Sequence, residues 1–300
     1  MGMEDVARGV RRLTAPNPSA MTHTGTQSYV VGQGSVAVID PGPAHPGHLA
    51  ALLGGLEPGE RVAAILVTHT HVDHSPGAAR LAAETGAPTY GFGPHGAGMR
   101  PQMQVLAAAS GGAIGGGEGA DRTFAPDHAL SDGAAVEGEG WRLEALHTPG
   151  HLSNHLAFAL AGTGVLFTGD AVMGWATTLV SPPEGDMAAQ METLAQLAAR
   201  AEAGQDRIYL PGHGPAVTEP GALVSEQRAH RARRRADLLE ALAAGPDTAS
   251  GFARRLYRDV DAALLPMAAR NVLATLLALE AEGAAAAEGP LAAETRFRLA

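Results

Sequence analysis

The segment THTHVDHSPG, residues 68–77, places three histidines and one aspartate within six positions, directly after the apolar run VAAILV. Histidine is the commonest metal ligand in proteins, and neutral imidazoles beside a carboxylate are typical of a divalent-cation site. His69 and His71 stand two residues apart at the end of a strand, so both imidazoles project to one side and can bind one ion. Asp73 and His74 follow on a turn and address a second point beside the first. Four-coordination of two ions requires further ligands from elsewhere in the chain.

Three further candidate ligands each follow a predicted strand. The segment LHTPGH supplies His151, LFTGD supplies Asp170 and YLPGHG supplies His213. The glycines and prolines in these segments allow the tight turns that swing a side chain off a strand end. We predict a dinuclear site with Asp170 as the bridging ligand and two groups around it: His69, His71 and His151 for one ion, and Asp73, His74 and His213 for the other.

Two such ions would support hydrolysis. Zinc lowers the pKa of bound water toward ~7, and two ions about 3.5–4 Å apart can share the resulting hydroxide and neutralise an oxyanion. Asp73 is the candidate catalytic residue, because it can orient the hydroxide or pass its proton to a leaving group. The chain contains no cysteine, so the ligands must be nitrogen and oxygen. We predict two zinc ions, with manganese or iron as alternatives.

The elements that must position these residues form a pattern of strands with interspersed helices. Strands are predicted at 29–43 (a pair), 61–69, 87–92, 141–147, 155–160, 164–169 and 207–215, and helices at 75–86 and 186–204. This pattern favours a sheet sandwich with outer helices. The Gly-rich segment 91–120 predicts a loop-like, mobile insertion that serves as a lid.

The character of the chain changes near residue 220. Three helices are predicted at 225–245, 248–257 and 264–283, with Thr248 capping the second, and a small hairpin follows. Residues 1–220 contain 10 arginines against 21 acidic residues, whereas residues 221–300 contain 11 against 10. We therefore predict two units, a hydrolase domain at 1–220 and a winged-helix-like domain at 221–300.

The motifs H-x-H-x-D-H, TPGH, TGD and PGHG, in this order, resemble those of the metallo-β-lactamase fold superfamily. The resemblance implies an α+β fold, in which an αββα sandwich precedes the C-terminal domain. The segments HTPGHLSNH, LFTGDAVMGWATT and ARNVLATLLALEAEG extend the similarity to the β-lactamase-like-protein-two branch over nearly the whole chain. Leu152 replaces the threonine usual after the TPGH histidine, and Gln27 replaces an asparagine common in this branch.

Characterised members of that branch cleave single-stranded RNA, so the resemblance implies a metal-dependent endoribonuclease. The arginines of RAHRARRR, residues 228–235, could bind phosphates through the C-terminal domain, although a solvated helix face is the ordinary alternative. The acidic balance of residues 1–220 argues against a tight grip on RNA. Hydrolysis of a small ester, a thioester of the hydroxyacylglutathione type or a lactone is the second hypothesis. A DNA-binding regulator with a vestigial metal site is the third, and the complete ligand set argues against it.

Several polar residues outside the ligand set have candidate roles. Asn154 and His155 are expected to face the substrate, with a core position as the alternative for His155. Asp40 is expected either to support a ligand imidazole or to form a simple turn, and His147 either to support a ligand or to be a hydrogen-bonded core histidine. The remaining loop histidines are expected at the surface: His23, His45, His48, His95 and His128.

The composition bounds the setting of the protein. We find no apolar run of the roughly 20 residues that cross a bilayer and no secretion signal at residues 1–12, so we expect a cytoplasmic protein without a membrane partner. All 21 basic residues are arginine, which excludes Schiff-base chemistry and a P-loop lysine. A homodimer would be an ordinary arrangement.

Overall fold

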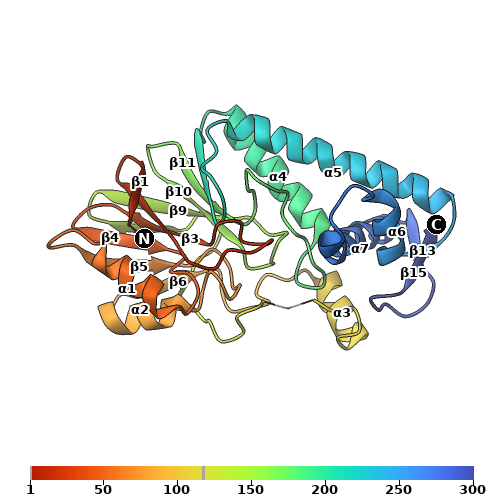
Figure 1. Ribbon diagram of the computed structural model, residues 1–300, viewed down its shortest axis with the longest axis horizontal. Helices are drawn as coiled ribbons and strands as arrows, with labels where there is room; N and C mark the ends of the chain where they lie inside the picture. Colours follow the sequence, from red (N-terminus) through yellow and green to blue (C-terminus); the bar gives the residue numbers. More distant parts are fainter. Residues whose placement is uncertain (1, 117–118) are drawn as a thin grey trace.

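The computed structural model describes residues 2–116 and 119–300, and two β-sheets form its larger part (Figure 1). The first sheet has seven strands, in the order β1 (Glu4–Ala7), β2 (Val10–Thr14), β3 (Gln27–Val31), β4 (Ser35–Ile39), β5 (Arg61–Leu66), β6 (Thr89–Gly91) and β7 (His128–Ala129). The second has five strands, in the order β12 (Ile208–Pro211), β11 (Val165–Gly169), β10 (Leu156–Leu160), β9 (Trp141–His147) and β8 (Ala135–Gly138).

The two sheets pack face to face and helices cover their outer faces. Tyr29, Leu66 and Phe158 belong to the buried cluster between the sheets. Helices α1 (Pro46–Gly54) and α2 (Gly77–Thr85) cover the first sheet, and α4 (Met187–Glu202) covers the second (Figure 1). All residues of β3, β4 and β11 are buried, as expected for strands covered on both faces. The predicted αββα sandwich is confirmed.

Most of the predicted elements of the sandwich are present. Helix α2 ends where the sequence predicts, at Gly86, whose φ of +74° is the left-handed conformation that glycine adopts easily. The sequence pattern does not predict the strands β1, β2 and β8 or the helix α1. β2 carries two arginines among its five residues, and α1 begins with the dipeptide Pro-Gly. Neither segment therefore shows a clear apolar period.

The C-terminal part is a winged-helix domain. It contains α5 (Pro220–Ala243), α6 (Ala249–Leu256), α7 (Leu265–Ala281) and a three-stranded sheet in the order β13 (Asp247–Thr248), β15 (Arg296–Leu299), β14 (Ala285–Ala287). The predicted cap is confirmed, because the Thr248 side chain accepts a hydrogen bond from the amide of Gly251. The closing hairpin is the antiparallel pair β14–β15.

Helix α5 is shared between the two units. The predicted boundary at residue 220 coincides with its first turn, and the helix continues without a linker. Val224, near its start, packs in the cluster that joins α4 to the second sheet. Leu238 and Leu242, near its end, pack in the core of the winged-helix domain. The long helix at the top of Figure 1 therefore fixes one unit against the other.

The prediction that residues 91–120 are loop-like is wrong for the described part of that segment, whereas its role as a lid stays a prediction. It contains helix α3 (Pro101–Ser110), with a proline in its first turn and Gly111 in the left-handed conformation at its end. Met103, Leu106 and Ile114 are buried in the same cluster as Phe252 of the winged-helix domain. Residues 117–118 of the predicted lid lie outside the described residues. The described part is anchored by apolar contacts.

The segment Ala262–Ala281, which includes α7, is long and apolar enough to cross a membrane by length and composition alone. Its buried side chains Val272, Leu276 and Leu279 pack in the winged-helix core. The expectation that the chain contains no apolar run of this length is wrong. Only 33% of the segment is buried, but core helices of soluble proteins can have the same length and hydropathy, so one such segment is weak evidence for a membrane span.

The anchoring of α3 can be tested by comparing two adjacent positions. Leu106 is 7% exposed, and Leu106→Ala should destabilise the contact between α3 and the winged-helix core by about 2–5 kcal/mol. We expect subtilisin to cleave the segment 91–116 faster in this variant under native conditions. Val105→Ala is the control, since Val105 is 68% exposed. Equal cleavage rates in the two variants would show that α3 is not held by this contact.

Candidate functional site

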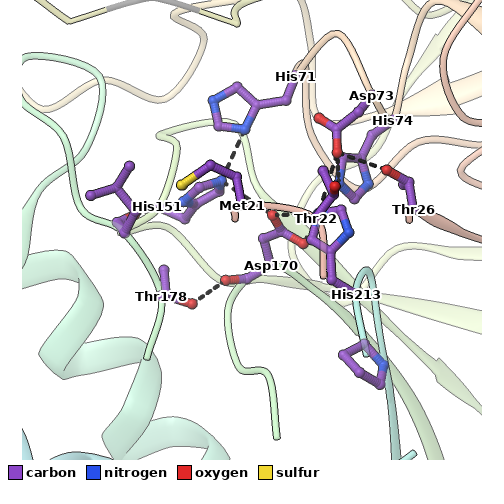
Figure 2. A network of polar contacts seen from close by, with 12 residues as sticks. Met21, Thr22, Thr26, His71, Asp73, His74, His151, Asp170, Thr178 and His213 are labelled. Atoms are coloured by element: carbon purple, nitrogen blue, oxygen red, sulfur yellow. Dashed lines mark hydrogen bonds and ion pairs between the residues drawn. The ribbon is translucent and has the colours of Figure 1, made fainter. Parts of the chain in front are cut away.

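The seven predicted ligands converge at one edge of the sandwich, and Figure 2 shows six of them, all except His69. Their ligand atoms form two groups, and within each group all atoms lie within 4.8 Å of one another: His69, His71, His151 and Asp170, and Asp73, His74 and His213. Four of the candidate ligands lie in the loop after β5 of the first sheet. His151, Asp170 and His213 follow β9, β11 and β12 of the second sheet. The two sheets thus contribute to one site, and the two groups correspond to the two predicted.

Asp170 lies between the two groups. In the first group, His71 Nδ1 lies 3.0 Å from His69 Nε2 and 2.9 Å from His151 Nε2. Asp170 Oδ2 lies 3.6 Å from His151 Nε2 and 3.3 Å from His213 Nε2. This placement is the one expected of a carboxylate that bridges two cations.

The outer ring nitrogens show how the histidines are oriented. Nδ1 of His74 lies 2.9 Å from Asp40 Oδ2, and Nδ1 of His151 lies 2.7 Å from the carbonyl oxygen of Leu179. Nδ1 of His213 lies 3.2 Å from the carbonyl oxygen of Gly25. Because each of these oxygens accepts a hydrogen bond from Nδ1, it is Nε2 that faces the site in all three rings and would bind a cation.

This donor set fits two divalent cations. Nitrogen lone pairs and carboxylates converge at separations that suit ligands of a shared ion. The Oδ1 atom of Asp170 is buried and has no hydrogen-bond partner among residues 2–116 and 119–300. A buried carboxylate oxygen is costly without a partner, and a cation bound at this place would supply one.

Asp40 supports one histidine of each group, so its predicted supporting role is confirmed. Its Oδ2 accepts hydrogen bonds from Thr68 Oγ1 at 2.7 Å and from His74 Nδ1, and its Oδ1 accepts one from the amide of Thr68 at 2.7 Å. Since Thr68 donates its hydroxyl proton to Asp40, its oxygen accepts from His69 Nδ1, 2.9 Å away. Asp40 has a φ of +49°, which aspartate tolerates better than most residues.

The electrostatics of the site favour the ligand forms of His69, His71 and Asp170, whereas neighbouring carboxylates raise the pKa of His74 and His213 despite their burial. Burial lowers the pKa of His71 to about 3 and that of His69 well below its ordinary value, so both imidazoles are neutral. Burial alone would favour a neutral Asp170, but the imidazoles of His213 and His74 hold its pKa far below the usual range. Burial opposes charge on His213 as well, yet the Asp170 carboxylate raises its pKa to about 9. Cation binding at the second group must therefore displace a proton from His213.

The prediction that Asn154 and His155 face the substrate is wrong. His155 is fully buried, and its Nε2 accepts a hydrogen bond from the amide of Asp170 while its Nδ1 donates to Thr148 Oγ1. Its ring stacks on that of His69, with centroids 5.0 Å apart. Asn154 is 2% exposed and donates to Thr70 Oγ1 and to the carbonyl oxygen of Gly93. His155 therefore contacts two candidate ligands, Asp170 and His69, whereas Asn154 contacts Thr70, which stands between His69 and His71 in the chain.

Two of the histidines expected at the surface lie elsewhere. His48 is 2% exposed and lies 2.8 Å from the hydroxyl of Ser28. His95 lines the cleft above the ligands, with its Nδ1 3.2 Å from Thr70 Oγ1. Of the two roles expected for His147, the structure shows the hydrogen-bonded histidine, because its Nε2 donates to the carbonyl oxygen of Ser153 at 2.9 Å.

The sequence did not indicate two further contributors to the site. Thr26 donates a hydrogen bond to Asp73 Oδ2 at 2.8 Å, as Figure 2 shows. Thr178 donates from its hydroxyl to the carbonyl oxygen of Asp170. Thr26 lies in the N-terminal GTQ segment and Thr178 in the loop after TGD. Both positions lie close to ligands only through the folding of the chain, so motif spacing carried no signal for them.

Five of the seven candidate ligands form the floor of a cleft of about 460 Å³: His71, Asp73, His151, Asp170 and His213. Its polar lining includes His71, Asp73, Asp170 and Glu184. Its remaining walls include Met21, Leu152 and Leu179, together with Pro266, Met267 and Arg270. The last three residues belong to helix α7, so the winged-helix domain forms part of the cleft.

Comparison with known proteins identifies the family. The model of the metallo-beta-lactamase superfamily matches residues 21–213, a span that contains all seven candidate ligands. The chain belongs to the metallo-beta-lactamase superfamily. A second model, the beta-lactamase associated winged helix domain, matches residues 248–292. This superfamily member thus carries an additional domain of the kind that its sequence predicts.

The relatives of this metallo-beta-lactamase chain include proteins of similar length. A beta-lactamase-like protein 2 homolog from Drosophila melanogaster is 29% identical, over 91% of this chain and 88% of the relative. A protein from Aspergillus novofumigatus named atrochrysone carboxyl ACP thioesterase is 27% identical, over 83% of this chain and 67% of the relative. The crystal structure of a metallo-beta-lactamase family protein from Thermus thermophilus is similar with a TM-score of 0.74 and 26% identity, covering 99% of this chain and 100% of that one. A further solved structure, in a di-iron-bound form, has a TM-score of 0.50 and 26% identity, covering 70% of this chain and 95% of that one.

The role of Asp40 leads to a test on metal binding. Asp40→Asn keeps the shape of the side chain but replaces one carboxylate oxygen by an NH2 group, which can only donate. The side chain therefore loses at least one of the hydrogen bonds that Asp40 accepts from Thr68 and His74. We expect the affinity for zinc to fall about 10–100-fold, because the partners that orient ligands contribute this much. Competition titration against a chromophoric chelator measures the change.

Asp5→Asn serves as the control, because Asp5 is an exposed aspartate in β1 far from the ligand segments in the chain. Equal zinc affinity of the Asp40→Asn variant and the unmodified protein would contradict the supporting role of Asp40.

Proposed function

We propose that this protein is a dinuclear metal-dependent hydrolase of thioesters or esters with an apolar acyl group. The observation that carries the proposal is the cleft itself, in which five of the seven converging ligand side chains form the floor while Met21, Leu152, Leu179 and Met267 line the walls. An apolar wall beside a hydrolytic centre suits an acyl chain better than a phosphodiester backbone. The name of the Aspergillus relative, a thioesterase, supports the same class of reaction.

The residues of the cleft have distinct roles in this reaction. Two bound ions would lower the pKa of a coordinated water toward neutrality and polarise the substrate carbonyl. Asp73, which lines the cleft, is kept ionised because the imidazoles of His74 and His213 outweigh the effect of burial on its pKa. Thr26 orients this carboxylate by donating to Oδ2. Asp73 can therefore take the proton of the attacking water and pass it to the leaving thiolate or alkoxide as the acyl bond breaks.

The charges of the cleft and of α5 support this choice over RNA. Glu184 lines the cleft and would repel a phosphate backbone, whereas the charges of Asp73 and Asp170 would be offset by the bound cations. Arg231, from the arginine run that predicts a phosphate track, is buried and donates to Asn271 Oδ1 and to the carbonyl oxygen of Thr178. Its guanidinium serves an internal contact.

Cleavage of single-stranded RNA is the second candidate. The observation in its favour is the match to the Drosophila beta-lactamase-like protein 2 homolog, which extends over both domains. The exposed Arg228 and Arg233 of α5 are the side chains that would contact phosphates through the C-terminal domain.

Zinc is the proposed metal, because five of the seven candidate ligands are histidines and zinc binds readily to histidine nitrogens and carboxylate oxygens. Iron and manganese bind to the same donors, and the di-iron form of a solved relative supports iron as the alternative.

The reaction is tested with a panel of substrates. The protein loaded with zinc or with iron is incubated with acyl thioesters, esters, lactones and single-stranded RNA. We expect turnover of the thioesters, and a loss of about 10²–10⁴-fold in kcat for Asp73→Asn, the range typical of general acid–base catalysis. Asp132→Asn is the control, because Asp132 is exposed and lies outside the cleft. RNA cleavage that depends on Asp73, without thioester turnover, would replace the proposal by the second candidate.

A further inference from the structure

The first turn of α7 lies over the candidate metal centre. Pro266, Met267 and Arg270 line the same cleft as His71 and Asp170. Met267 is half-buried, and residues 267 and 270 lie three apart on the helix, so their side chains share one face. The winged-helix domain thus contributes a wall to a cleft whose floor belongs to the sandwich.

Contacts on both sides fix this wall in position. Arg270 donates from Nε to Ser181 Oγ at 2.8 Å and from Nη1 to the carbonyl oxygen of Ile114 at 2.5 Å. One residue further along α7, Asn271 Oδ1 accepts from the amide of Val180 at 3.0 Å and from Arg231 at 3.1 Å. The start of α7 is therefore tied to the sandwich segment 178–182 and to the segment that follows α3.

The segment 178–182 also supports two ligands. The carbonyl oxygen of Leu179 accepts from His151 Nδ1. Thr178 donates to the carbonyl oxygen of Asp170, as Figure 2 shows. The distance between the wall and the metal ligands is thus set by one short, hydrogen-bonded segment. A wall held in this way can discriminate substrates by their length.

The chemistry of the wall indicates what it contacts. Leu152 and Leu179 line the sandwich side of the cleft, and Pro266 and Met267 line the α7 side. Met21, also in the lining, is 40% exposed, which is unusual for so large an apolar side chain. An unbranched acyl chain would fill such a slot, because each methylene buried there strengthens binding by about fourfold.

We propose that Met267, supplied by the winged-helix domain, sets the length of the acyl chain that the cleft accepts. The inference rests on the proposed thioester or ester hydrolysis. It gives the winged-helix domain a part in substrate selection, and it assigns the selection to a residue outside the superfamily's hydrolase domain.

The test is a chain-length profile. The value of kcat/KM is measured for straight-chain acyl thioesters of increasing length with the unmodified protein, Met267→Ala and Met267→Phe. Met267→Ala removes three heavy atoms, so we expect the optimum to move to chains about two or three carbons longer, with a gain of about fourfold for each added methylene that finds room. Met267→Phe should shift the optimum to shorter chains. Leu299→Ala is the control, since Leu299 is an exposed apolar residue of the same domain outside the cleft.

Binding without turnover gives a second readout. Calorimetry with S-alkyl thioethers, which carry no cleavable carbonyl, should show the same length shift in the metal-free protein. Unchanged profiles in both Met267 variants, with thermal unfolding temperatures like that of the unmodified protein, would overturn the inference. Absence of thioester and ester turnover in the unmodified protein would overturn the proposed function instead. If thioether binding then still depended on Met267, the α7 wall would still be shown to select ligands by chain length.

Discussion

The carboxylate of Asp40 is the contact on which the arrangement of the site depends. It accepts from His74 directly and reaches His69 through the hydroxyl of Thr68, so it orients one imidazole in each ligand group. An acceptor at Nδ1 fixes the tautomer and the ring orientation in which the Nε2 lone pair of an imidazole faces a cation. Asp40 lies at the end of β4 and Thr68 follows β5, and these strands pair in parallel. The geometry of the first sheet is therefore transmitted directly to the ligands.

The second constraint is that no single element holds the site. The first sheet provides the four ligands after β5, whereas His151, Asp170 and His213 come from the second sheet. Cations bound between them would hold the two sheets together at this edge. The winged-helix domain adds a third support, because Arg231 and Asn271 bind the segment that contacts His151 and Asp170. The two domains thus act on one site, although their cores are separate clusters.

Sequence reasoning succeeded where chemistry is encoded in local spacing. The spacing at the strand ends predicted seven candidate ligands in two groups, and these side chains converge as expected, because residue type and turn geometry are both local. Metal binding by them stays a prediction. Sequence reasoning failed for His155 and Asn154, since closeness to His151 in sequence does not say on which side of the turn a side chain lies. In residues 91–120 the many glycines suggested a loop, although PQMQVLAAAS forms a helix with a proline in its first turn. The apolar face of this helix packs on the winged-helix domain, which is distant in sequence. The role of α7 in the cleft depends wholly on contacts of this non-local kind, and no local pattern could have indicated it.

The claim on which this account depends is that the two ligand groups each bind a cation. Elemental analysis of the purified protein, after equilibration with zinc and removal of loosely bound metal, tests it most directly. The account predicts two ions per chain, and fewer than two when Asp170 is replaced by asparagine. A protein that retains no metal, or a variant that retains as much as the unmodified chain, would contradict it.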